Sequence, residues 1–209
     1  MAKHDLPYRE NRFLKRSYRL IAPIYDLVVS RPLHGARSQM LRTLPTEQAK
    51  RILLSGIGTG LDLPLLPKLH HYTALDFSAA MLERARPRAA GLEVEWVMGD
   101  SMALPFAGSQ FDHVVLHLIL AVVPYPAACL AEAARVLKPG GTIVIFDKFL
   151  RPRQIALLRR VLNPLSRRIA TRLDVVFEEV LREVPQLQKV SDIPLLAGGW
   201  FRGIVLEKK

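Results

Sequence analysis

Cysteine and long apolar runs are almost absent from this chain of 209 residues. Its single cysteine, Cys129, cannot form an internal disulfide or a cysteine-based zinc site, which favours a reducing compartment. The longest apolar run, Val114–Val123, is shorter than the roughly 18 residues of a membrane span. The first residues lack the apolar core of a signal peptide, and His70 and His71 have no acid or cysteine beside them, so no metal site is expected. We therefore expect a cytoplasmic protein, at most peripheral at the inner face of a membrane.

Acidic residues are scarce: 19 Asp and Glu stand against 30 Lys and Arg, for a net charge of +11. Residues 1–42 carry a net +6, and residues 148–172 carry a net +8 with no acid, so the remainder is slightly acidic. Such clustering points to a polyanionic partner, either nucleic acid or an anionic lipid surface, unless it is only a solvated basic surface. Aromatic residues are only 7% and the basic segments carry aliphatic stripes, which disfavours nucleic acid.

Short apolar runs alternate with helical patterns between residues 50 and 150, which predicts a doubly wound α/β fold around a parallel sheet. Strands are expected at 51–54, 72–75, 94–97, 111–116 and 142–146, with helices at 78–90, capped by Ser78, and at 127–137, ended by Lys138–Gly141. We expect one domain over 1–209, with lid helices in 1–44 (12–20 and 23–44), a core at 50–150, basic amphipathic helices in 151–186 and terminal strands in 187–209.

A glycine-rich segment, Ser55–Gly60, follows the first expected strand and precedes a helical stretch. Glycines at 56, 58 and 60 allow a tight turn and a close approach of the backbone to a ligand. The GxGxG spacing, followed by Leu61, differs from the GxGxxG fingerprint and argues against a nicotinamide or flavin dinucleotide. An ordinary strand–helix turn is the alternative.

Two aspartates fall at the carboxyl ends of the next two strands. Asp76 ends the second strand, where an acid can accept hydrogen bonds from ribose hydroxyls, and Asp100 follows the third, where an acid can accept from an adenine amino group. A helix-capping or turn aspartate is the alternative for each. In open α/β sheets ligands bind at this edge, so the glycine segment and both acids predict one nucleoside site.

These segments, together with Phe106–Asp112 and Arg135–Gly141, resemble in order the motifs of class I S-adenosylmethionine-dependent methyltransferases. The resemblance covers about residues 50–150 and implies a Rossmann-like seven-stranded sheet whose last strand is antiparallel. Leu54 stands where the family usually has an acid, which leaves Ser55 or backbone carbonyls to replace it and keeps open a non-catalytic S-adenosylmethionine- or lipid-binding protein. The implied cofactor is S-adenosylmethionine, held by Ser55, Gly56, Gly58, Gly60, Asp76, Phe77, Asp100, Ser101 and Met102.

Two subfamilies fit this chain. Ile21–Asp26, Gly58–Pro64, Ala121–Pro124 and Ile145–Phe149 resemble segments of the bacterial phosphatidylethanolamine N-methyltransferases. The quinone C-methyltransferases share several motifs but usually differ at Ala121–Pro124. We therefore expect a lipid substrate, with phosphatidylethanolamine favoured over a ubiquinone or menaquinone precursor; an RNA methyltransferase is a further alternative.

Candidate catalytic and substrate residues follow from position. His117, after the fourth strand, suits a general base, although a buried structural histidine is the alternative. Aromatic faces tolerate a cationic amine, which makes Tyr25 a catalytic candidate and Tyr18 and Phe149 substrate candidates. Arginines in the aliphatic-striped segment 153–168 suit an anionic lipid surface. These arginines are Arg159, Arg160, Arg167 and Arg168.

Overall fold

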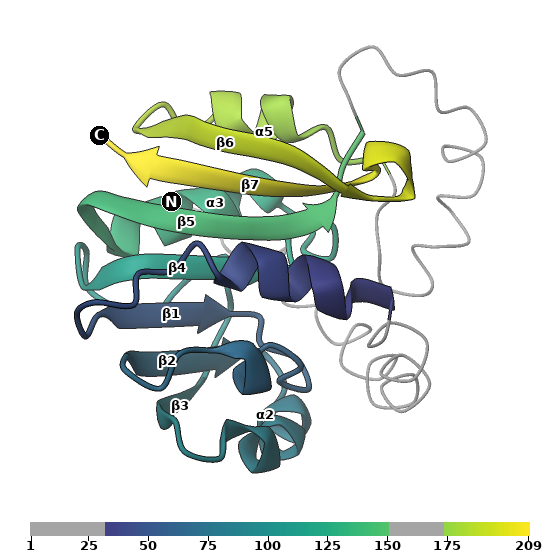
Figure 1. Ribbon diagram of the computed structural model, residues 1–209. Coiled ribbons are helices and arrows are strands. Elements are labelled where there is room, and N and C mark those ends of the chain that lie inside the picture. The colour runs from purple at the N-terminus through teal and green to yellow at the C-terminus, as the bar shows by residue number, and fades with distance from the viewer. Residues whose placement is uncertain (1–31, 151–173) are drawn as a thin grey trace.

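The chain folds around a seven-stranded sheet with the strand order β3-β2-β1-β4-β5-β7-β6 (Figure 1). The computed structural model describes residues 32–150 and 174–209. Strands β1 to β5 are parallel, whereas β7 is antiparallel to β5 and β6 is antiparallel to β7. The expected α/β architecture, with a parallel core and an antiparallel strand at the end of the chain, is confirmed.

The described elements lie within a few residues of the expected ones. The strands are β1 (Arg51–Ser55), β2 (His71–Asp76), β3 (Glu93–Met98), β4 (Phe111–His117), β5 (Leu137–Lys148), β6 (Leu187–Leu196) and β7 (Phe201–Lys208). A helix over 32–41 precedes them. The other helices are α2 (Ala79–Ala85), α3 (Pro126–Val136) and α5 (Phe177–Arg182), and the 3-10 turns are η1 (Leu63–Leu65), η2 (Arg86–Ala89) and η3 (Ala197–Gly199).

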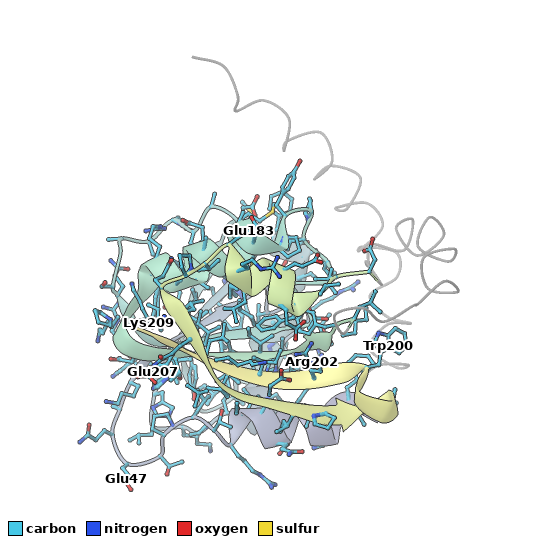
Figure 2. The ribbon with its side chains drawn as sticks, turned by 90° about the horizontal axis from the view of Figure 1, so that it is seen from above. Glu47, Glu183, Trp200, Arg202, Glu207 and Lys209 are labelled. Carbon is cyan, nitrogen blue, oxygen red and sulfur yellow. The ribbon has the colours of Figure 1, made fainter. Side chains whose placement is uncertain are left out.

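Hydrophobic cores lie on both faces of the sheet, because successive strand residues point to opposite faces. In β5, Ile143 and Ile145 join the core with α3 and α5, whereas Val144 and Phe146 join the core with helix 32–41 and α2. Figure 1 shows helix 32–41 crossing in front of the strands, and Figure 2 shows α5 on the opposite side of the sheet. Both faces of the central strands β1, β4 and β5 are therefore covered, which explains their apolar runs, whereas the edge strand β3 alternates glutamate with apolar residues.

Two helical segments differ from expectation, and proline explains both. The helix expected over 78–90 is the shorter α2 followed by η2, because Pro87 lacks the N–H that an α-helix requires. Ser78 occupies the N-cap position of α2, but its side chain makes no capping hydrogen bond. The glycine segment leads only into η1, since Leu66, which precedes Pro67, has extended backbone (φ −82°, ψ 142°).

The segment Lys138–Gly141, expected to separate a helix from a strand, is part of β5 itself. The register between β4 and β5 shifts between Phe111 and His113, and Gly140 has a φ of 72°. A bulge in a strand pair accommodates extra residues without ending the pairing. Pro139, Gly140 and Gly141 therefore lie in the irregular first part of β5.

Strand β7 lies between β5 and β6 and contacts both layers. Gly203 lies directly under Met40 of helix 32–41, since a Cβ atom at position 203 would overlap the Met40 sulphur. On the other face Arg202 Nε donates to Asp192 Oδ1 of β6 at 3.0 Å, and Nη2 donates to Glu178 Oε1 of α5 at 2.6 Å. One strand thus joins the N-terminal helix to the C-terminal part of the chain.

Several expected elements lie outside the described residues. These are the helix at 12–20, the first part of the helix at 23–44 and most of the basic segment in 151–186, of which α5 is described. Among the described helices, none is both long enough and apolar enough to cross a membrane.

Candidate functional site

The carboxyl end of β1 leads into the glycine loop, residues 56–60. Gly56, Gly58 and Gly60 have φ values of 73°, 57° and 80°, in the left-handed region that favours glycine. The Gly56 N–H donates to the Leu75 carbonyl at 2.8 Å, which fastens the loop to β2. A Cβ atom at position 56 would collide with Ile119, whereas one at position 58 would meet open space. The loop is therefore packed at its start and open at Gly58.

Asp76, the last residue of β2, lies against this loop. Its Oδ2 accepts from the Gly58 N–H at 2.8 Å and its Oδ1 accepts from the Ser78 N–H at 2.9 Å. Burial raises the pKa of Asp76, and these backbone hydrogen bonds oppose the rise. Each carboxylate oxygen has a second lone pair, so Asp76 can also accept hydrogen bonds from a pair of ligand hydroxyls.

The segment after β3 is tied to the same edge. Ser55 Oγ, at the end of β1, donates to Ser101 Oγ at 2.8 Å, and both side chains are buried. Asp100 Oδ1 accepts from the Met102 N–H at 2.8 Å, which fixes the turn. Leu54 is buried in the core beside them. Ser55 therefore holds the segment after β3, and it contributes a hydroxyl next to Leu54, the position at which the family usually has an acid.

A buried ion-pair chain lies where β4 ends. Arg37 Nη1 donates to Asp62 Oδ1 at 2.8 Å, and His117 Nδ1 lies 3.1 Å from the same oxygen. The side chains of Arg37, Asp62 and His117 are 8%, 6% and 1% exposed. Burial by itself disfavours ionisation of Asp62, but His117 and Arg37 together hold the pKa of this carboxyl well below its usual value. The chain connects helix 32–41, the segment after the glycine loop and β4.

Two buried nitrogens of this chain, Arg37 Nε and His117 Nε2, have no hydrogen-bond partner within residues 32–150 and 174–209. An ionised carboxylate only accepts hydrogen bonds, so the contact with Asp62 requires the proton on Nδ1 of His117. In the neutral ring, Nε2 then keeps a free lone pair. A buried polar atom without a partner costs about 1–3 kcal/mol, which a ligand donor would remove.

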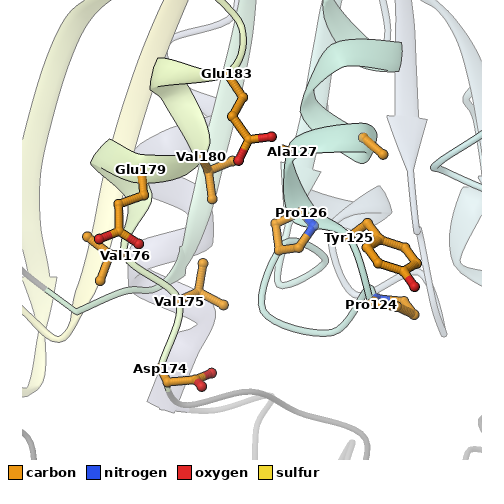
Figure 3. Close-up of a pocket in the computed structure, with 11 residues that line it drawn as sticks. Pro124, Tyr125, Pro126, Ala127, Asp174, Val175, Val176, Glu179, Val180 and Glu183 are labelled. Carbon is orange, nitrogen blue, oxygen red and sulfur yellow. The ribbon is translucent and has the colours of Figure 1, made fainter.

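An apolar groove with an acidic side lies between the start of α3 and α5 (Figure 3). Tyr125, which is 54% exposed, lies on the α3 side. Glu179 and Glu183 lie on the α5 side, and Asp174 lies at one end (Figure 3). The described lining includes none of the residues expected to bind a nucleoside. This groove is therefore a surface separate from the glycine loop.

Phe149, expected to face a substrate, is placed in the core. Its side chain is 1% exposed and its ring centroid lies 5.1 Å from that of Phe177 in α5. Asp147 is fully buried and accepts from the Ala121 and Lys148 N–H groups at 2.9 and 2.8 Å, which makes it a structural residue of the loop after β4. His113 Nδ1 lies 2.7 Å from Thr142 Oγ1, at the other end of β4 from His117.

The other candidates cannot be placed by the structure. Tyr18 and Tyr25 lie outside the described residues. The same is true of Arg159, Arg160, Arg167 and Arg168. Their roles remain predictions from the sequence.

The strand order, together with the glycine loop at the carboxyl edge of the sheet, defines the class of this protein. It has the α/β fold of methyltransferases that bind a nucleoside cofactor. Residues 53–145 match the family model "Methyltransferase domain". The chain is 32% identical over 203 residues to a phosphatidylethanolamine N-methyltransferase of Cereibacter sphaeroides, covering 94% of this chain and 98% of that protein. The chain therefore belongs to the class I S-adenosylmethionine-dependent methyltransferases, and S-adenosylmethionine is its methyl donor.

Other relatives match a smaller part. A ubiquinone/menaquinone biosynthesis C-methyltransferase of Ruegeria sp. is 34% identical over 138 residues, covering 61% of this chain and 55% of that protein. The chain thus spans about half the length of the quinone relatives that it matches. The crystal structure of a possible histamine N-methyltransferase from Thermotoga maritima aligns with a TM-score of 0.70 at 21% identity, covering 95% of this chain and 99% of that one, which shows the shared fold.

The residues at the carboxyl edge fit this donor. Gly58 offers open space at a backbone position, which permits close approach of a ligand, and Asp76 retains acceptor capacity for two hydroxyls. Asp100 and Met102 form a turn at the next strand end, where the adenine is expected. When bound, S-adenosylmethionine supplies an electrophilic methyl group. The task of this chain is to hold the acceptor in line and to keep its nucleophile unprotonated.

Two functional candidates, Arg37 and Asp62, were not expected from the sequence. The sequence does contain a pattern that could have identified Arg37. This residue lies four positions after Leu33 and four before Leu41, on the apolar stripe of its helix. Asp62 interrupts the apolar run Leu61–Leu66 in the same way. A charged residue on a buried stripe needs a partner, and here the two partners are each other.

Proposed function

We propose that this enzyme transfers a methyl group to the amine of phosphatidylethanolamine at an anionic membrane surface. The observation that carries the proposal is the extent of similarity. The phosphatidylethanolamine N-methyltransferase relative matches almost end to end, whereas the quinone methyltransferase of Ruegeria matches over 138 residues. The shared region thus includes the segments outside the donor-binding core, which in this fold are free to differ with the acceptor.

The charge distribution supports a membrane-bound acceptor. Residues 148–172 carry eight basic residues and no acid, and residues 1–42 carry a net +6. Each Lys or Arg near an anionic bilayer contributes about 1 kcal/mol, so either segment is sufficient for reversible attachment. Arg159, Arg160, Arg167 and Arg168 are the proposed contacts with the lipid phosphates.

The chemistry requires an unprotonated amine held in line with the donor methyl group. Alignment alone contributes several kcal/mol to the rate. Aromatic faces stabilise the cationic head group before and after transfer, and Tyr18 and Tyr25 are the proposed residues for this role. His117, at the end of β4, is the proposed acceptor of the amine proton.

The proposal is tested with purified protein, radiolabelled S-adenosylmethionine and vesicles of phosphatidylethanolamine with an anionic lipid. Label in the mono-, di- or trimethylated aminolipid is the expected result. Vesicles of phosphatidylcholine with the same anionic lipid are the control. Label only in a demethylmenaquinone or ubiquinone precursor added to the vesicles would overturn the proposal in favour of C-methylation. Label only in added RNA would overturn the choice of a lipid altogether.

The membrane contact is tested separately by replacing Arg159, Arg160, Arg167 and Arg168 with serine. Binding to anionic vesicles in a flotation assay should fall, while affinity for S-adenosylmethionine in solution should not change. A matched variant removes four basic residues elsewhere, Lys50, Arg84, Arg88 and Lys138, and should bind vesicles as the wild type does. Equal losses in both variants would refute a specific contact.

A further inference from the structure

The ion-pair chain of Arg37, Asp62 and His117 lies at the point where the strand order of the sheet reverses. Strand β1 has β2 on one side and β4 on the other. The chain continues from β1 to β2 and from β4 to β5, so these two connections run in opposite directions along the sheet. Ligands of open α/β sheets bind in the crevice at this switch point, beyond the carboxyl ends. Asp62 follows the glycine loop after β1, and His117 is the last residue of β4. The two residues therefore meet at the switch point, one from the segment after β1 and one from the end of β4.

We propose that Arg37 and Asp62 are positioning residues that hold His117 with its proton on Nδ1 and its Nε2 lone pair free to accept a proton from the methyl acceptor. This inference rests on the proposed function, since it assigns the proton of the acceptor amine. In the step proposed, the N–H bond of the acceptor breaks, the proton bonds to His117 Nε2, and the electron pair stays on the acceptor nitrogen.

The hydrogen-bond directions support this assignment. Asp62 is ionised because two cationic or donor groups, Arg37 and His117, converge on its Oδ1. An ionised carboxylate accepts from Nδ1 and so fixes the tautomer and the ring orientation together. The rings of Phe146 and His117 pack at a steep angle to one another, with the centroids 5.7 Å apart, which restricts rotation of the imidazole. Nε2 is the atom left without a partner.

The role of Arg37 follows from charge and anchoring. Arg37 supplies the positive charge that balances the buried Asp62 carboxylate, so His117 is not needed as its counter-ion. Arg37 is fixed by helix 32–41, whose Leu33, Met40 and Leu41 are buried in the core. The charged groups that the structure records against His117 are thus Asp62 from the loop side and, through it, Arg37 from the helix, while β5 contributes the uncharged Phe146.

The proton position is measured directly by nitrogen-15 NMR of the full chain labelled at histidine. His117 is assigned with the His117→Gln variant among the six histidines. We expect a neutral ring with the proton on Nδ1 near pH 7.5. A proton on Nε2 in the wild type, or an imidazolium throughout about pH 6–8, would overturn the inference.

Kinetics supply the second readout. His117→Gln should lower kcat by about 10²–10⁴-fold and Asp62→Asn by about 10–100-fold, with the affinity for S-adenosylmethionine unchanged. His113→Gln, on the same strand but away from the crevice, is the matched control and should keep kcat. An unchanged kcat in His117→Gln would overturn the inference.

Folding of the variants is a separate question with its own control. Asp62→Asn leaves the Arg37 guanidinium buried without a counter-charge, so the double variant Arg37→Gln/Asp62→Asn is measured beside it. The NMR result on the wild type needs neither variant to fold. An Nδ1 proton together with no methylation of phosphatidylethanolamine would refute the proposed function and support the positioning of His117. An imidazolium together with methylated lipid would refute the positioning of His117 and support the proposed function.

Discussion

Alanine at Gly58 separates the cost of backbone strain from the loss of donor binding, because the structure offers a matched control. Gly58 and Gly198 have φ values of 57° and 64°, and a Cβ atom at either position would have no heavy atom within 4 Å. An alanine in this region costs about 1–2 kcal/mol, of which about 0.4–1 kcal/mol is offset by a less flexible unfolded chain. Both variants should therefore lose up to about 1.5 kcal/mol of unfolding free energy, or a few degrees in Tm.

Only Gly58→Ala should also weaken binding of S-adenosylmethionine, since Gly58 belongs to the glycine loop and Gly198 to η3 between β6 and β7. The added methyl group occupies the space through which the ligand approaches the backbone. Loss of one hydrogen bond to a charged ligand is worth about 1.5–3 kcal/mol, so the Kd should rise by about 10- to 150-fold. Calorimetric titration and thermal unfolding measure the two quantities. Wild-type affinity in Gly58→Ala, or an equal loss in Gly198→Ala, would show that the open space at Gly58 is not where the donor binds.

Three further predictions follow from buried charges and a buried thiol. Asp76→Asn replaces one of the two carboxylate oxygens that accept backbone N–H groups with an amide NH2 that cannot accept, so it should unfold at a lower Tm and bind S-adenosylmethionine at least tenfold more weakly by titration. Burial by itself raises the pKa of Asp192, but Arg202 and Lys189 together lower it, so these contacts stabilise the fold above about pH 4 and less so as the pH falls. Arg202→Ala should lose about 3–5 kcal/mol in urea unfolding at pH 7, with a smaller difference from wild type near pH 3. Burial raises the pKa of the Cys129 thiol, so it should react with a thiol reagent only after unfolding; rapid labelling of the native protein would contradict its placement in the core.

The parallel core could be predicted from the sequence because its strands are buried on both faces. Runs such as Ile52–Leu54 and Val114–Leu116 are apolar throughout, and each ends at a glycine or polar residue that marks the edge. Asp76 and the glycine loop were found by the same logic. What failed was the local structure around proline, at Pro67 and Pro87, where a helical pattern is present but the backbone cannot follow it.

The misplacement of Phe149 and the omission of Asp62 have one cause. Chain position locates a residue at the end of a strand, but not on which face its side chain lies or what the last elements of the chain place beside it. Phe149 faces α5, which begins 28 residues later at Phe177. Asp62 meets Arg37 across 25 residues. Both contacts depend on packing between elements that no local pattern connects.

The packing of Gly203 against Met40 also constrains the order in which the sheet closes during synthesis. Strand β7 is made after every element that it separates or touches, yet it lies inside the sheet, between β5 and β6. Until Phe201–Lys208 leaves the ribosome, β6 has no partner strand, β5 has an open edge, and helix 32–41 lacks part of the surface on which it rests. The nascent protein therefore exposes an unpaired strand edge that a chaperone can bind, and closure of that edge coincides with the final docking of the helix that carries Arg37.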